Sequence, residues 1–110
     1  MDRYVFHIIR RDEWLEALER GDYVPASLSA EGFIHCSTAG QVSATAARWF
    51  AGEKDLLLLR IDTQLLTAAL KYEAPRNGGP ERQNELFPHL YGALNLDAVV
   101  EVEDLSHDGL

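Results

Sequence analysis

A chain of 110 residues, 46% of them hydrophobic, is long enough to bury one core and short enough for one domain. We expect a single domain over residues 1–110, with its core at about residues 4–105 and a tail at residues 106–110. A net charge of −8 argues against DNA as a partner, since the overall field repels a polyanion. No apolar run is long enough to span a membrane, and the single cysteine, Cys36, fits the reducing cytoplasm, where we expect the protein.

The N-terminal part of the chain predicts a strand followed by a helix. Residues 4–9 are β-branched and aromatic, which is typical of a strand, and His7 is the most polar of them. Asp12 is a good N-cap for a helix over residues 12–20, and Gly21 is suited to end it. Apolar residues at helical spacing predict the buried face of this helix: Trp14, Leu15 and Leu18.

A connector over residues 22–31 is expected to lead into a strand at residues 32–37, directly before a second helix. Thr38 stands three residues before Gln41, which is the spacing of a capping box at a helix start. Gly52 is placed to end that helix. Four apolar residues predict its buried stripe: Val42, Ala46, Trp49 and Phe50.

The C-terminal half predicts three more strands, at residues 55–62, 70–74 and 98–105. The first of them is almost continuously apolar, as expected for a strand that is covered on both faces. Residues 75–85 have turn chemistry and two arginines, Arg76 and Arg82, which is typical of a lid, a binding loop or a mobile loop. The whole pattern predicts a compact α+β domain with about five or six strands and two main helices.

The strand at residues 32–37 ends in reactive side chains. Alternation puts His35 and Ser37 on one face, beside the start of the following helix. The free amides of a helix start suit an anionic group, so Ser37 and Thr38 are candidate ligand contacts. In the alternative interpretation His35 bonds to neighbouring backbone and the hydroxyl groups only cap the helix.

Cys36 lies next to His35, which suggests a cysteine nucleophile. Neighbouring residues of a strand point to opposite faces, however, so His35 is poorly placed to activate the thiol. We therefore expect Cys36 to be a buried structural residue.

A second polar group lies near residues 87–92. His89 and Tyr91 suit hydrogen bonding to a ligand and stacking on it, and a packed turn is the alternative for the same segment. Glu73, at the end of a predicted strand, is the best-placed carboxylate, either for a site or for a cross-strand cation. Both interpretations of these residues stay open.

Histidines on three separate elements, His7, His35 and His89, could converge on a metal ion. None of them has the short spacing of a metal-binding motif, so we predict no metal site. The chain also contains neither a glycine-rich dinucleotide fingerprint nor a P-loop.

Two long motifs carry a resemblance to a known family. They are Gly-Phe-Ile-His-Cys-Ser-Thr at residues 32–38 and Phe-Pro-His-Leu-Tyr-Gly at residues 87–92. The resemblance also includes His7 on the opening strand and Trp14 on the first helix, and it extends over about residues 4–105. With these motifs the chain resembles DUF952, a family of bacterial and plant proteins that has no settled activity.

The DUF952 family is in turn remotely similar to the ADP-ribosyltransferase-like fold, which implies a split mixed β-sheet that holds NAD. On that resemblance His35 holds a ribose hydroxyl, Tyr91 borders a base, and Glu73 stabilises the positive charge that develops on the ribose. The chain lacks a Ser-Thr-Ser element and its Glu73 precedes Tyr91, so nucleotide binding is implied more strongly than transfer. The candidate catalytic residues are His35, Glu73 and His89, and the candidate ligand contacts are His7, Ser37, Thr38 and Tyr91.

Three functional hypotheses result. The first is a protein that binds NAD or a related nucleotide, with ADP-ribosyl transfer, phospho-transfer or glycohydrolase activity. The second is a non-catalytic module for a small ligand or a protein partner, and the third is a metal-dependent hydrolase. The position of the candidate residues in the fold separates these hypotheses, because the first needs them to line one cavity.

Overall fold

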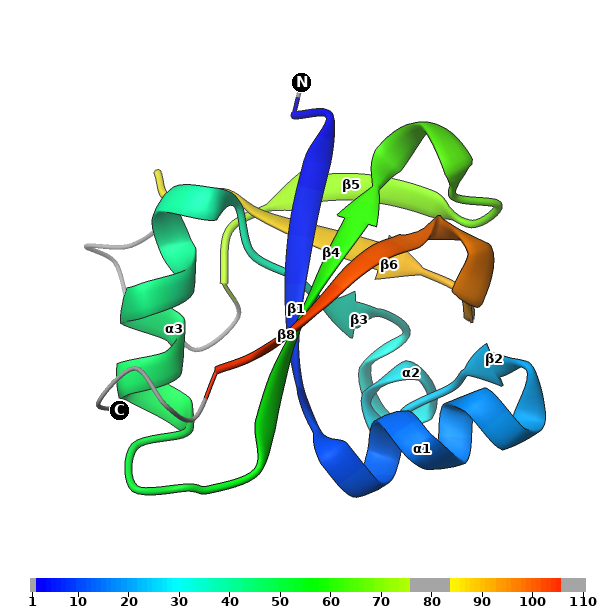
Figure 1. Cartoon of the computed structure of the whole chain (residues 1–110). Helices are drawn as coiled ribbons and strands as arrows, with labels where there is room; N and C mark the ends of the chain where they lie inside the picture. Colours follow the sequence, from blue (N-terminus) through cyan, green and yellow to red (C-terminus); the bar gives the residue numbers. More distant parts are fainter. Residues whose placement is uncertain (1, 76–83, 106–110) are drawn as a thin grey trace.

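Helices and small antiparallel sheets make up the computed structural model, which describes residues 2–75 and 84–105 (Figure 1). The strands are β1 (Tyr4–Arg10), β2 (Asp22–Tyr23), β3 (Ile34–His35), β4 (Leu56–Asp62), β5 (Ala69–Glu73), β6 (Phe87–Tyr91), β7 (Leu94–Asn95) and β8 (Val99–Asp104). The α-helices are α1 (Arg11–Arg20), α2 (Ala26–Glu31) and α3 (Val42–Trp49), and short 3-10 helices occupy Ala39–Gln41, Thr63–Leu65 and Leu96–Ala98. The predicted α+β class and the two main helices, α1 and α3, are confirmed.

The described strands form three sheets, with the orders β1-β4-β8, β3-β6-β5 and β2-β7. Every pairing among them is antiparallel, so the prediction of a mixed sheet is wrong. An isolated bridge joins the two larger sheets: the Phe6 amide donates to the Ser37 carbonyl at 2.8 Å, and the Ser37 amide donates to the Phe6 carbonyl at 2.7 Å. This bridge fixes the end of the predicted strand at residues 32–37 beside β1.

Apolar side chains cover the first sheet on both faces. Trp14 and Ala17 of α1 pack in one cluster with Leu57, Leu59 and Ile61 of β4. Ala46 of α3 packs in a second cluster with Leu56, and Figure 1 shows α1 and α3 on opposite sides of these strands. The prediction that the apolar run of β4 is covered on both faces is confirmed, because its alternate residues belong to the two clusters.

Two details of α1 differ from the prediction. The helix begins at Arg11, and Arg10, not Asp12, is its N-cap residue. Leu15 and Leu18 are 54% and 51% exposed, because the face that meets the sheet follows Trp14 and Ala17 instead. Gly21 ends the helix with φ +94, the left-handed conformation that glycine adopts at no steric cost.

The predicted connector over residues 22–31 contains two short elements. Asp22 and Tyr23 form β2 by pairing with Asn95 and Leu94, and α2 follows it. A strand of two residues shows no alternation, so only the pairing with a distant segment defines it. The sequence predicts the connector but neither of the two elements within it.

The start of the second helix agrees with the capping-box spacing. The Thr38 amide donates to Oε1 of Gln41 at 2.9 Å, and α3 follows at Val42. Ala46 is fully buried as predicted, but Trp49 is 59% exposed, so its predicted place in the core is wrong.

The predicted strands at residues 55–62, 70–74 and 98–105 correspond to β4, β5 and β8. Residues 87–91 form β6, the central strand of its sheet, rather than a packed turn. Most of the predicted loop at residues 75–85, with Arg76 and Arg82, lies outside the described residues, as does the tail at residues 106–110. None of the described helices has the length and apolarity that a membrane crossing needs.

Candidate functional site

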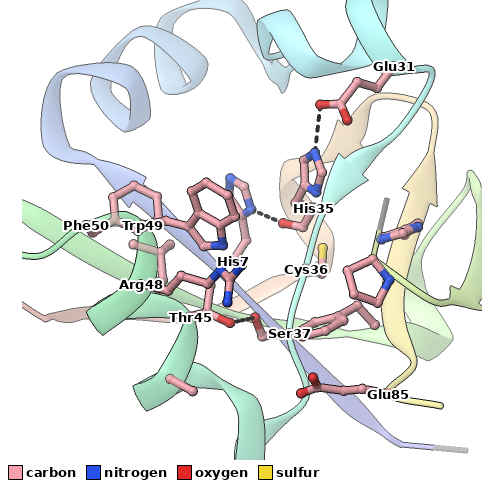
Figure 2. Close-up of a pocket in the computed structure, with 15 residues that line it drawn as sticks. His7, Glu31, His35, Cys36, Ser37, Thr45, Arg48, Trp49, Phe50 and Glu85 are labelled. Atoms are coloured by element: carbon pink, nitrogen blue, oxygen red, sulfur yellow. Dashed lines mark hydrogen bonds and ion pairs between the residues drawn. The ribbon is translucent and has the colours of Figure 1, made fainter. Parts of the chain in front are cut away.

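A cavity of about 670 Å³ opens where the two larger sheets meet α3. Figure 2 shows the segment that carries His35, Cys36 and Ser37 on one side of it, with Thr45, Arg48 and Trp49 of α3 on the other. The residues that line it are His7, Ile8, Glu31, His35, Cys36, Ser37, Ala44, Thr45, Arg48, Trp49, Phe50, Pro75, Glu85, Phe87 and His89. The predicted site residues His7, His35, Ser37 and His89 therefore meet at one cavity.

His35 and Ser37 reach the cavity from consecutive positions of the same face. His35 is exposed, and its Nε2 lies 2.9 Å from Oε2 of Glu31, which also lines the cavity. Ser37 is 5% exposed, and its hydroxyl donates to Oγ1 of Thr45 at 3.3 Å. The strand end thus offers an accessible imidazole together with a hydroxyl pair that joins it to α3.

His7 lines the cavity, but protein groups engage both of its ring nitrogens. Nδ1 lies 2.6 Å from the His35 carbonyl, which can only accept, so Nδ1 carries the proton. Nε2 then accepts from the Tyr23 hydroxyl at 3.0 Å. Burial lowers the pKa of His7 to about 4, so the ring is neutral at pH 7. His7 ties β1 to β3 and β2, and this occupies the polar atoms that a ligand contact would need.

His89 lies on β6 and lines the cavity, and its imidazole is hydrogen-bonded to Glu73. His89 is 3% exposed and stacks on Phe33, with ring centroids 4.0 Å apart. Its Nδ1 lies 2.8 Å from Oε1 of Glu73, and the Tyr91 hydroxyl donates to the same oxygen at 2.5 Å. The Tyr91 hydroxyl and then His89 lower the pKa of Glu73, so this carboxylate is ionised and orients the imidazole.

Three predicted site residues lie away from the cavity lining. Glu73 and Tyr91 act on His89, so neither stands where the resemblance places a group that touches the ribose or the base. Thr38 uses its backbone amide on Gln41, and the cavity is lined by the middle and end of α3, not by its start. An anion at the helix N-terminus is therefore not part of this arrangement.

Cys36 belongs to the core, although it contacts the cavity wall. It is 4% exposed, lies in the larger apolar cluster, and carries a free thiol. Burial raises the pKa of this thiol to about 12, so it is protonated at pH 7 and a poor nucleophile. The predicted structural role of Cys36 is confirmed.

A family model matches most of the chain. Residues 8–102 match the family described as "Protein of unknown function (DUF952)". The chain belongs to the DUF952 family. No curated protein matches the chain.

Solved structures of one protein, CC0527 from Caulobacter crescentus, are similar to the chain. Its crystal structure is 37% identical with a TM-score of 0.79, and the match covers 97% of this chain and 91% of that one. A double mutant of CC0527 is 36% identical with the same TM-score and the same coverage. The solution NMR structure is 37% identical with a TM-score of 0.77, and the match covers 96% of this chain and 86% of that one.

Three polar or aromatic cavity residues of this DUF952 domain come from α3 and are absent from the sequence prediction: Thr45, Arg48 and Trp49. Helical periodicity predicts Trp49 to be buried, because an apolar position beside a cavity and one in the core look alike in the pattern. The sequence contains one weak signal for these residues, the pair Arg48-Trp49, which follows the buried Ala46 by two and three positions.

His7, His35 and His89 of this DUF952 domain all line the cavity, as the metal hypothesis requires. Within residues 2–75 and 84–105, however, no group of three His, Cys, Asp or Glu side chains is placed to hold a metal ion. His7 also uses both ring nitrogens on protein atoms. The cavity instead presents the imidazoles of His35 and His89, a hydroxyl pair, an arginine and an aromatic ring beside two carboxylates, Glu31 and Glu85. This mixture of polar and aromatic groups suits a small organic molecule with an aromatic part and polar groups.

Proposed function

We propose that the protein binds NAD or a related nucleotide in this cavity. The observation that carries the proposal is the convergence of His35, Ser37 and His89 on one cavity of about 670 Å³. A volume of this size lies within the range of small-molecule and cofactor sites, roughly 300–1,000 Å³. Imidazole and hydroxyl groups match the ribose hydroxyls and phosphates of such a ligand.

An ADP-ribosyltransferase-like arrangement is part of the proposal. Two separate three-stranded sheets that meet at the Phe6–Ser37 bridge support it, because that fold also holds its ligand between the halves of a split sheet. His7 on β1 and His35 on β3 lie on either side of this junction.

The chemistry that we propose for the site is transfer or hydrolysis at the ribose. The bond between the ribose C1′ and the nicotinamide nitrogen breaks, and its electron pair leaves with nicotinamide. An acceptor oxygen then bonds to C1′ and passes its proton to Nε2 of His89, while Nδ1–H of His89 donates to Glu73. His35 orients a ribose hydroxyl, and Ser37 with Thr45 contacts an anionic group. In phospho-transfer the same base would take the proton of an acceptor oxygen that attacks phosphorus, while the bond from that phosphorus to the leaving oxygen breaks and its electron pair leaves with that oxygen.

A calorimetric titration with NAD, followed by chromatography for released nicotinamide, tests this function. We expect His35→Ala to weaken NAD binding at least about tenfold, since it removes a polar contact of the ligand. Gln64→Ala is the control, because Gln64 is exposed and lies outside the cavity lining. The proposal is refuted if the wild-type protein neither binds NAD nor releases nicotinamide from it.

A non-catalytic module for a small ligand is the second candidate function. The position of Glu73 favours it, because this carboxylate is engaged by His89 and Tyr91 instead of facing a ligand. This candidate predicts saturable NAD binding without nicotinamide release, and release above the uncatalysed rate would exclude it.

A further inference from the structure

The last turn of α3 presents an exposed tryptophan to the cavity. Trp49 is 59% exposed and lines the cavity, whereas Trp14, the other tryptophan, is 9% exposed and packs in the core. Tryptophan has a large apolar surface that folding normally removes from water. An indole left in the wall of a cavity retains this surface for a second aromatic group.

The neighbouring residue, Arg48, is an arginine that forms no ion pair with the described carboxylates. The other arginines within the described residues form ion pairs, namely Arg3, Arg10, Arg11, Arg20 and Arg60. Arg48 makes no ion pair among the residues that the structure describes, and its guanidinium lies 5.4 Å from the Trp49 ring centroid. The carboxylates of Glu31 and Glu85 also line the cavity, so Arg48 is the lining residue whose fixed positive charge would attract an anionic group of a ligand.

We propose that Trp49 and Arg48 form the subsite for a nucleobase and the phosphate next to it. The inference rests on the proposed function and deepens it. The base stacks on the indole, which is tolerant of base identity because every base has a π face. The guanidinium donates to the phosphate oxygens, which its planar fork matches. Figure 2 shows both side chains reaching from α3 toward the segment of His35 and Ser37, so one nucleotide can contact both groups.

The stacking is tested by measuring the affinity for NAD of the wild-type protein and of three variants, Trp49→Phe, Trp49→Ala and Leu15→Ala. Leu15 is a matched control, since it is 54% exposed on α1 and lies outside this cavity. We expect Trp49→Ala to weaken binding at least about tenfold, Trp49→Phe to stay within about threefold of wild type, and Leu15→Ala to change nothing. NAD should also quench the wild-type tryptophan emission strongly and that of Trp49→Phe weakly.

Arg48→Met tests the phosphate contact, with ADP-ribose and adenosine as the two ligands. We expect the substitution to weaken ADP-ribose binding at least about tenfold and to leave adenosine binding within about threefold.

The inference is overturned if wild type binds NAD and Trp49→Ala binds it equally well. It is also overturned if Arg48→Met lowers thermal stability without changing ADP-ribose affinity, because Arg48 would then only stabilise the last turn of α3. Absence of any NAD binding by wild type refutes the proposed function itself.

Discussion

The carboxylate of Glu73 shows how single contacts set the chemistry of the site. Its pKa lies below the ordinary value because the Tyr91 hydroxyl, and to a smaller extent His89 and Lys71, stabilise the ionised form. We predict that Tyr91→Phe raises the pKa of Glu73 toward its ordinary value, and that Lys71→Met raises it less. Carbon-13 NMR titration of the carboxyl group measures both shifts. A larger shift in Lys71→Met than in Tyr91→Phe would contradict this order of causes.

His7 makes a prediction for the pH dependence of stability. Its pKa falls from 6.5 to about 4 on folding, so the unfolded chain takes up a proton first as the pH decreases. The free energy of unfolding should therefore decrease between about pH 6.5 and pH 4, by at most about 3 kcal/mol from this residue. His7→Gln removes the titrating group, so urea unfolding at several pH values should show a flatter dependence for this variant. Identical slopes in the two proteins would rule the explanation out.

The turn after β6 depends on close packing between two segments. A Cβ atom on Gly92 would lie 2.7 Å from Cβ of Ala68, which is closer than such atoms approach. We predict that Gly92→Ala destabilises the protein by about 1–3 kcal/mol in chemical unfolding. Combining it with Ala68→Gly should restore most of the loss, and Gly40→Ala, which meets open space, is the control. No rescue in the double variant would show that the clash is not the cause.

Elements differ in how far their sequence determines them. The strands β4, β5 and β8 follow from local patterns, because their alternation or their apolar run is several residues long. β2 and β7 depend on each other across the chain, since neither two-residue segment has a period of its own. The buried face of α1 is also decided by the sheet, which contacts Trp14 and Ala17 and leaves Leu15 in water.

In the molecule as a whole, the sequence predicts the histidine and serine residues of the cavity better than the residues that α3 contributes. Strand parity places His35 and Ser37 together, and the second motif supplies His89. The role of Glu73 depends on the pairing of β5 with β6, which sets it beside His89, and no local pattern specifies that pairing. Trp49 and Arg48 reach the cavity through the packing of α3, which periodicity does not distinguish from burial in the core.

The most direct test of nucleotide binding at the cavity is an NMR titration of the nitrogen-15-labelled protein with NAD. We predict concentration-dependent shifts at the amides of His35, Ser37 and His89 and at the Trp49 indole, all of which belong to the cavity wall. The chemical shifts of the amides of the exposed strand β8 should not change, since Val100 and Val102 lie outside the cavity. Shifts confined to β8, or no shifts at millimolar NAD, would contradict nucleotide binding at this site.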